Sequence, residues 1–245
     1  MTIEPVELHH RIEGSEDAPV LVMASSLGTT LDMWDAQAPA LRERFRIVRY
    51  DHRGHGGSPV PPGPYAMDNL GGDVLALMDR LGVEHFSFCG LSIGGMVGMW
   101  LASGAPERVQ KLVLCCTSAR FDPPDAWDTR AKTVRGNGVG AIADAVLERW
   151  FTPAFREERP EVLEWAGGML RNTSVEGYAG CCEAIRAAAL RPRLRGISAP
   201  TLIIAGADDP AAPVEKAEIM RSGIPDSRLA VIRAVGPHRE RREVR

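Results

Sequence analysis

The chain has 245 residues, of which 44% are hydrophobic and 25% charged, and 29 Lys and Arg against 32 Asp and Glu give a net charge of −3. These values are ordinary for a globular protein of one or two domains and exclude a disordered or fibrous chain. The slightly acidic balance argues against nucleic acid or an anionic membrane as the main partner, and no apolar run is long enough to span a bilayer.

The first residues lack the basic and apolar regions of a signal peptide. The cysteines are odd in number and include two adjacent pairs, which favours free thiols in a reducing compartment over a disulfide framework. They are Cys89, Cys115, Cys116, Cys181 and Cys182. We therefore expect a cytoplasmic protein.

Short apolar runs alternate with helical patterns along most of the chain. Residues 6–12 alternate apolar and polar side chains, as an antiparallel edge strand does. Helical periodicity is clearest at residues 73–81 and 94–103. Six further strands are predicted at residues 18–24, 46–50, 85–89, 111–116, 201–205 and 228–232. This alternation predicts an α/β fold, with a mostly parallel sheet and helices on both faces.

The alternation stops between residues 118 and 199, where helical patterns and three Trp residues occur without a predicted strand. We interpret this segment as a helical lid over the carboxyl edge of the sheet, where parallel sheets bind their ligands. The expected organisation is a core of residues 1–117 and 200–245, interrupted by the lid at 118–199.

Residues 90–94 read Gly-Leu-Ser-Ile-Gly and lie between a predicted strand and a predicted helix. Gly-x-Ser-x-Gly in this setting is typical of a nucleophile elbow, a tight turn that strains Ser92 and needs glycines for close packing. The hydroxyl of Ser92 then stands clear for attack, and the N–H of Ile93 supplies one donor to an oxyanion hole. The alternative is a Gly-rich turn without chemical use.

A serine nucleophile needs an acid and then a histidine later in the chain. Asp208 and Asp209 follow the predicted strand at 201–205, where a carboxylate can hold an imidazole N–H and fix its tautomer. We predict Asp209 as the acid, with Asp208 in reserve, although either can instead cap the next helix. His238 is the one histidine beyond His85 and is the predicted base, unless it is an ordinary tail residue.

The second oxyanion donor is expected from the loop at residues 25–28, and Leu27 has the right position in it. A second Gly-rich loop contains His52 and His55. A metal site needs at least three placed ligands, and no third residue falls in register. We therefore predict no metal and no cofactor, and a structural loop held by Arg53.

These motifs resemble the α/β-hydrolase superfamily over essentially the whole chain. Within it, the chain resembles the 3-oxoadipate enol-lactonases in residues 26–29, 33–35 and 177–186. The resemblance implies opening of the lactone of 3-oxoadipate during the breakdown of aromatic acids. It assigns the nucleophile to Ser92, the acid to Asp209 and the oxyanion donors to Leu27 and Ile93. One departure is Ala189, near which an Asp is expected, because Ala cannot make the hydrogen bonds of that Asp.

The implied substrate is a small anionic lactone, so a cation in the lid is needed to bind its carboxylate. Arg130 and Arg186 are the candidates for this cation, and Trp127 and Trp150 are candidates for apolar walls. For each arginine, the alternative is a solvated surface side chain.

Residues 236–245 read Gly-Pro-His-Arg-Glu-Arg-Arg-Glu-Val-Arg and offer no apolar face for the closing helix that such a fold needs. Back-translated with GC-leaning codons and read one base later, this stretch can encode Ala-His-Ile-Ala-Asn-Val-Glu, which resembles the segment expected around the histidine of an enol-lactonase. We hypothesise a frameshift. Sequencing the gene tests it, and a clean reading frame whose alternative frame soon stops contradicts it.

Three alternatives stay open: a general carboxylesterase, a cofactor-free haloperoxidase, and an inactive hydrolase-fold protein. Ser92 argues against dehalogenases and epoxide hydrolases of similar fold, which use an aspartate as nucleophile. Labelling of Ser92 by a fluorophosphonate separates an active enzyme from an inert protein. Turnover of the enol-lactone against p-nitrophenyl acetate separates the two enzyme classes.

Overall fold

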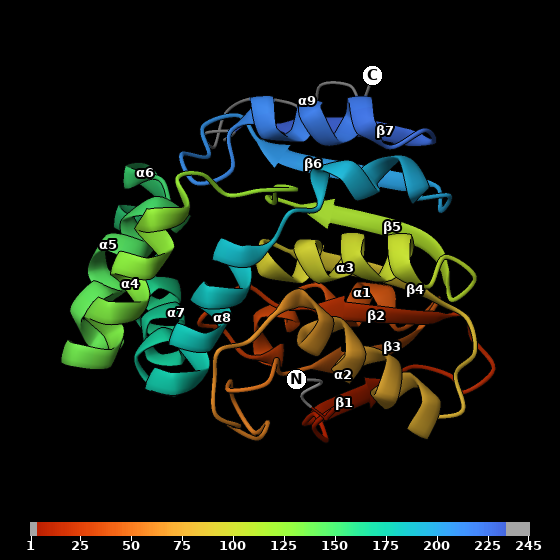
Figure 1. The fold of residues 1–245 in the computed structure, drawn as a ribbon, viewed down its shortest axis with the longest axis horizontal. Coiled ribbons are helices and arrows are strands. Elements are labelled where there is room, and N and C mark those ends of the chain that lie inside the picture. Colours follow the sequence, from red (N-terminus) through yellow and green to blue (C-terminus); the bar gives the residue numbers. More distant parts are fainter. Residues whose placement is uncertain (1–3, 234–245) are drawn as a thin grey trace.

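The computed structural model describes residues 4–233, which form a seven-stranded sheet in the order β1-β3-β2-β4-β5-β6-β7 (Figure 1). The strands are β1 (His10–Glu13), β2 (Val20–Ala24), β3 (Arg46–Tyr50), β4 (Phe86–Leu91), β5 (Val109–Cys115), β6 (Thr201–Gly206) and β7 (Ser227–Ile232). β1 runs antiparallel to β3, and every other pair is parallel. The predicted fold class and the predicted strands are therefore confirmed.

Two boundaries differ from the prediction by more than two residues. The edge strand begins at His10, because two earlier backbone N–H groups bond to side chains instead: Val6 donates to Asp73 Oδ1 and His9 donates to Ser58 Oγ. The helix predicted at residues 73–81 begins earlier, as α2 (Met67–Arg80). Its start lacks a Ser, Thr or Asp cap, and the side chain of Asn69 accepts the N–H of Ala66 instead.

The two faces of the sheet are covered unequally. One face packs under α2, α3 (Ile93–Gly104) and α9 (Val214–Gly223), where it forms the main core (Figure 1). On the other face, η1 (Leu31–Trp34) and α1 (Ala38–Leu41) cover a smaller cluster over β2 and β3. Farther along that face, Leu202 of β6 keeps 38% of its surface exposed.

All the regular elements between β5 and β6 are helices. They are α4 (Pro124–Asn137), α5 (Gly140–Trp150), α6 (Pro153–Glu158), α7 (Pro160–Arg171), α8 (Val175–Ala187) and η2 (Arg191–Gly196). Figure 1 shows α4–α8 gathered at the end of the sheet toward which β5 points. Within residues 4–233, no helix has the length and apolar character to cross a membrane.

Candidate active site

Ser92 lies in the turn between β4 and α3 and has a φ of +54°, in the region that side chains rarely adopt. A Cβ at Gly90 would collide with the backbone of Gly94, and one at Gly94 would lie 2.5 Å from the carbonyl oxygen of Ala24. The N–H of Ser92 donates to the carbonyl of Cys115 at 2.9 Å. The predicted strained elbow is therefore confirmed, and both of its glycines are required by close packing.

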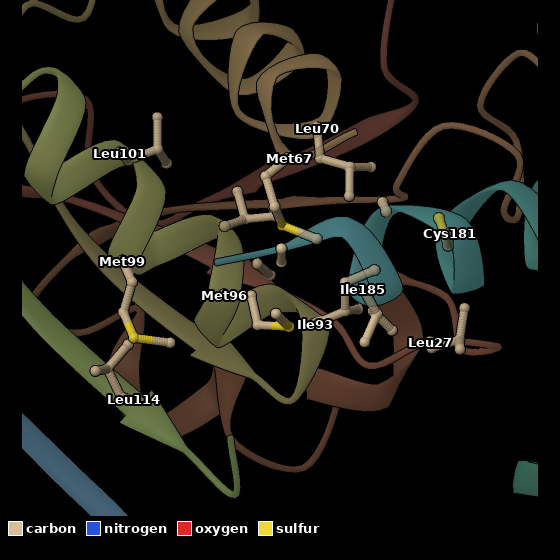
Figure 2. Close-up of a cluster of buried hydrophobic side chains, with 14 of the residues drawn as sticks. Leu27, Met67, Leu70, Ile93, Met96, Met99, Leu101, Leu114, Cys181 and Ile185 are labelled. Carbon is tan, nitrogen blue, oxygen red and sulfur yellow. The ribbon is translucent and has the colours of Figure 1, made fainter. Parts of the chain in front are cut away.

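The loop after β2, called here the β2 loop (residues 25–28), lies beside the elbow because β2 pairs with β4. The side chains of Leu27 and Ile93 are both buried in the main core, and Figure 2 shows them in one cluster. Burial of these side chains fixes the backbone that carries their N–H groups. Their role as oxyanion donors stays a prediction.

Two histidines hold the β2 loop on either side of Leu27. His52 Nε2 lies 3.0 Å from the carbonyl oxygen of Ser25, which can only accept, so this nitrogen carries the proton. The N–H of Gly28 donates to His55 Nε2 at 3.0 Å, so this nitrogen must be unprotonated. His55 Nδ1 then donates to the carbonyl of Arg53 at 3.2 Å.

Both imidazoles are almost fully buried, and burial lowers the pKa of each. For His55, burial and then the charge of His52 lower the pKa to about 4. Near neutral pH, His55 is therefore neutral, as its bond from Gly28 requires. Among residues 4–233, no group of three or more His, Cys, Asp and Glu side chains is placed to hold a metal.

Arg53 anchors the loop that carries these histidines, as predicted. Its guanidinium is fully buried and binds both carboxylate oxygens of Asp73 on α2, each at 2.6 Å. Two parallel charge-assisted bonds of this kind restrict orientation as well as distance. The β2 loop therefore rests on a loop that is itself fixed to the main helical layer.

Asp209 lies in the turn after β6 and is half-buried, whereas Asp208 is exposed. Oδ1 of Asp209 accepts the N–H groups of Ala211 at 2.8 Å and Ala212 at 3.0 Å. Asp209 therefore shapes the turn before α9, and this is compatible with a second bond from an imidazole to the same carboxylate. His238, the predicted base, lies outside the described residues.

Cys116 is a neighbour of Asp209 that sequence reasoning did not select. Burial, and next the charge of Asp209, raise the pKa of its thiol to about 11, so the thiol stays protonated near neutral pH. Cys116 has a positive φ of 42° in the segment that follows β5. No sequence signal marks this contact, because it depends on how two strand ends meet.

A cavity of about 600 Å³ brings the elbow and the acid together, since Ser92, Cys116 and Asp209 all line it. Ser26 of the β2 loop and Met33 of η1 line it at the carboxyl edge of the sheet. The opposite wall comes from the stretch of chain that runs from the end of α5 into α7. Its residues are Glu148, Arg149, Trp150, Phe151, Thr152, Pro153, Val162, Trp165, Ala166 and Met169.

Of the four residues nominated in the lid, Trp150 lines this cavity. Trp127 packs edge to face on Phe121, and the guanidinium of Arg130 lies 4.7 Å from its ring centre. Arg186 lines a different hollow and pairs with Asp128 at 3.2 Å. The structure therefore does not place Trp127, Arg130 or Arg186 among the residues that line the Ser92 cavity.

Arg149 lines the cavity and was missed at the sequence level. It sits in the last turn of α5, next to Trp150. The chain has 29 basic residues, and helical periodicity alone does not say which arginine faces the sheet edge. The adjacent Trp was the one local hint.

Residues 19–238 match the alpha/beta hydrolase fold family. The chain is 42% identical to 3-oxoadipate enol-lactonase 2 of Acinetobacter baylyi, over 96% of this chain and 88% of that protein. Among solved structures, the enol-lactonase from Burkholderia xenovorans LB400 is 45% identical over 93% of this chain and 88% of its own, with a TM-score of 0.91.

A thermophilic esterase from Thermogutta terrifontis, solved with malate bound, is 33% identical. It covers 95% of this chain and 87% of its own, with a TM-score of 0.88. The order of elements, the strained elbow and these matches agree, and the chain belongs to the alpha/beta hydrolase fold family.

Proposed function

We propose that the chain hydrolyses 3-oxoadipate enol-lactone to 3-oxoadipate, with Ser92 as nucleophile, His238 as base and Asp209 as acid. The observation that carries this proposal is one cavity lined by both the elbow serine and Asp209, in a chain 42% identical to an enol-lactonase. The reaction needs no metal and no cofactor.

The chemistry follows from these groups. Ser92 Oγ attacks the lactone carbonyl while His238 accepts its proton. The N–H groups of Leu27 and Ile93 stabilise the oxygen that becomes negative. Collapse breaks the ring C–O bond, and the enolate that leaves takes the proton held by His238 and becomes a ketone. Water, activated by the same histidine, then hydrolyses the acyl-enzyme and frees Ser92.

The segment at residues 118–199 serves in this scheme as a lid. Its helices α5–α7 supply the wall opposite Ser92 and make that wall largely apolar, with Trp150 and Trp165 facing the cavity. An apolar wall displaces water, and this strengthens the hydrogen bonds to the developing oxyanion. The core at residues 1–117 and 200–245 supplies the reacting groups.

The first test is hydrolysis of 3-oxoadipate enol-lactone by the purified full chain, beside a Ser92→Ala variant. We expect turnover in the first protein and its loss in the second. A folded chain that reacts at Ser92 with a fluorophosphonate but does not open the lactone contradicts the proposed substrate. A folded chain that does neither contradicts the proposed triad.

The second candidate is a general carboxylesterase, and the 33% identical esterase supports it. Comparing kcat/KM for the enol-lactone with kcat/KM for p-nitrophenyl acetate decides between the two. An enol-lactonase prefers its anionic lactone, whereas a general esterase has no reason to discriminate in favour of a carboxylate.

A further inference from the structure

The Ser92 cavity is lined by a single cationic side chain among the described residues, Arg149. Two acids besides Asp209 also line it. Glu148 pairs with Arg156 at 3.8 Å on the lid, and Asp208 is exposed in the turn after β6. A negatively charged ligand is therefore attracted to the end of α5, where Arg149 lies, and repelled from the turn that carries Asp208.

Arg149 has a second arginine close by, and this arrangement is costly without an anion. Partial burial of its guanidinium, and next the charge of Arg130, lower its pKa, although the residue as a whole is exposed. Within residues 4–233, neither arginine forms an ion pair with a carboxylate, in contrast to Arg135, Arg171 and Arg186 on the lid helices α4, α7 and α8. Two neighbouring cations that repel each other gain most from a carboxylate placed between them or against one of them.

Arg130 is held in place by aromatic contacts and not by an acid. Its guanidinium lies 4.7 Å from the centre of the Trp127 ring, and Tyr178 of α8 lies within range of its charge. Tyr178 is buried, and a Cβ on Gly28 would lie 3.0 Å from its ring. The charges of both arginines reach Tyr178, whose ring packs against Gly28 of the β2 loop.

We propose that Arg149, supported by Arg130, is the subsite that receives the carboxylate of the substrate and selects anionic lactones over neutral esters. This inference rests on the proposed function, because it assigns the acidic end of that substrate. It places the carboxylate at the lid wall and the scissile carbonyl at the sheet wall. The sequence predicted Arg130 or Arg186 for this role, and we assign it to Arg149 with Arg130 in support.

The test compares two substrates in five proteins: the wild-type chain, Arg149→Gln, Arg149→Lys, Arg171→Gln and Arg186→Gln. Arg171 is the matched control, because it lies on the same lid and pairs with Asp144 at 2.7 Å, but does not line the cavity. The substrates are the enol-lactone, which carries a carboxylate, and p-nitrophenyl acetate, which does not.

For Arg149→Gln, we expect kcat/KM on the enol-lactone to fall about 10- to 100-fold, mainly through KM, as for loss of a charge-assisted hydrogen bond. The fall on p-nitrophenyl acetate should be at least tenfold smaller. Arg149→Lys should recover part of the loss, because it keeps the charge without the fork of donors. Arg171→Gln should stay within twofold of wild type on both substrates.

Equal losses on both substrates, or no loss, overturn the proposal, as does a selective loss in Arg186→Gln instead. If the wild-type chain does not open the enol-lactone, the proposed function fails but the subsite is still tested. Adipate then serves as an inhibitor of p-nitrophenyl acetate turnover. Inhibition by adipate that weakens about tenfold or more in Arg149→Gln supports the subsite, and unchanged inhibition rejects it.

Discussion

On the sheet side of the cavity, Ser92 and the β2 loop rest on buried side chains with defined hydrogen bonds, whereas on the lid side Arg149 and Trp165 are exposed. In the proposed mechanism, the groups on the sheet side act on any ester in the same way, because nucleophilic attack and oxyanion stabilisation do not depend on the rest of the substrate. In the proposed function, the lid side selects the substrate. The difference suggests a simple rule: catalysis depends on the sheet side and substrate selection on the lid side. Substitutions on one side should therefore change one property without the other.

The largest expected effect is from Ser92→Ala, on the sheet side. It should lower kcat about 10⁴-fold or more on both the enol-lactone and p-nitrophenyl acetate, because no other group takes over nucleophilic attack. Steady-state assays with circular dichroism as the folding control measure this. Retained turnover on either substrate assigns that activity to another residue.

Next is His55, whose bond from Gly28 holds the β2 loop. His55→Ala leaves that buried N–H without an acceptor, and kcat should fall about 10- to 100-fold on both substrates with little change in KM. His55→Gln should recover much of the loss, because a side-chain carbonyl accepts the same bond. If kcat falls only on the enol-lactone in either variant, the sheet side also affects substrate selection, and the proposed division between the two sides is wrong.

Acidic pH should lower the free energy of unfolding of the protein, because His55 on the sheet side is buried in its neutral form. The folded pKa of His55 is about 4, below its unfolded value of about 6.5, so the unfolded chain binds more protons between these values. Stability present above about pH 6.5 is therefore lost as the pH falls toward 4, and the loss from this residue is about 2 kcal/mol at pH 5.

Urea unfolding at pH 7 and pH 5 measures this change. In His55→Gln, the pH-dependent loss should shrink by about that amount, and the remainder reports on His52, whose pKa burial also lowers. An identical pH dependence in both proteins excludes a neutral, buried His55.

The smallest effect is expected on the lid side. Trp150→Ala removes one apolar wall of the cavity, and KM for the enol-lactone should rise about fivefold while kcat on p-nitrophenyl acetate changes little. Initial-rate measurements are sufficient. A larger fall in kcat than in substrate affinity shows instead that the lid helps to build the reacting geometry.

The separation between the two sides also explains what the sequence could predict. The strands, the elbow and the Asp209 turn follow from local patterns, because short apolar runs and glycines are needed wherever a parallel sheet changes into helix. The roles of His52 and His55 did not follow. Their spacing is visible, but the backbone groups they meet belong to a loop about 27 residues earlier in the chain.

The lid residues that face the cavity were harder still to predict from the sequence. Arg149 differs from Arg171 and Arg186 only in what it faces, and this depends on how α5 and α7 pack together. Helical periodicity gives one buried stripe per helix and leaves the orientation of that stripe unknown. The predicted start of β1 was wrong for a related reason. The backbone N–H groups of residues 6 and 9 donate to the side chains of Asp73 and Ser58, which lie far away in the sequence.

The positive φ of Ser92 also has an evolutionary consequence. A glycine at this position would adopt the turn without the cost of a Cβ, so Ser92→Gly should stabilise the fold by about 1 kcal/mol while removing the nucleophile. Selection for a longer-lived protein, acting alone, would therefore discard the serine. A serine in a turn that favours glycine is therefore expected where its hydroxyl is used, as the proposed nucleophilic role requires.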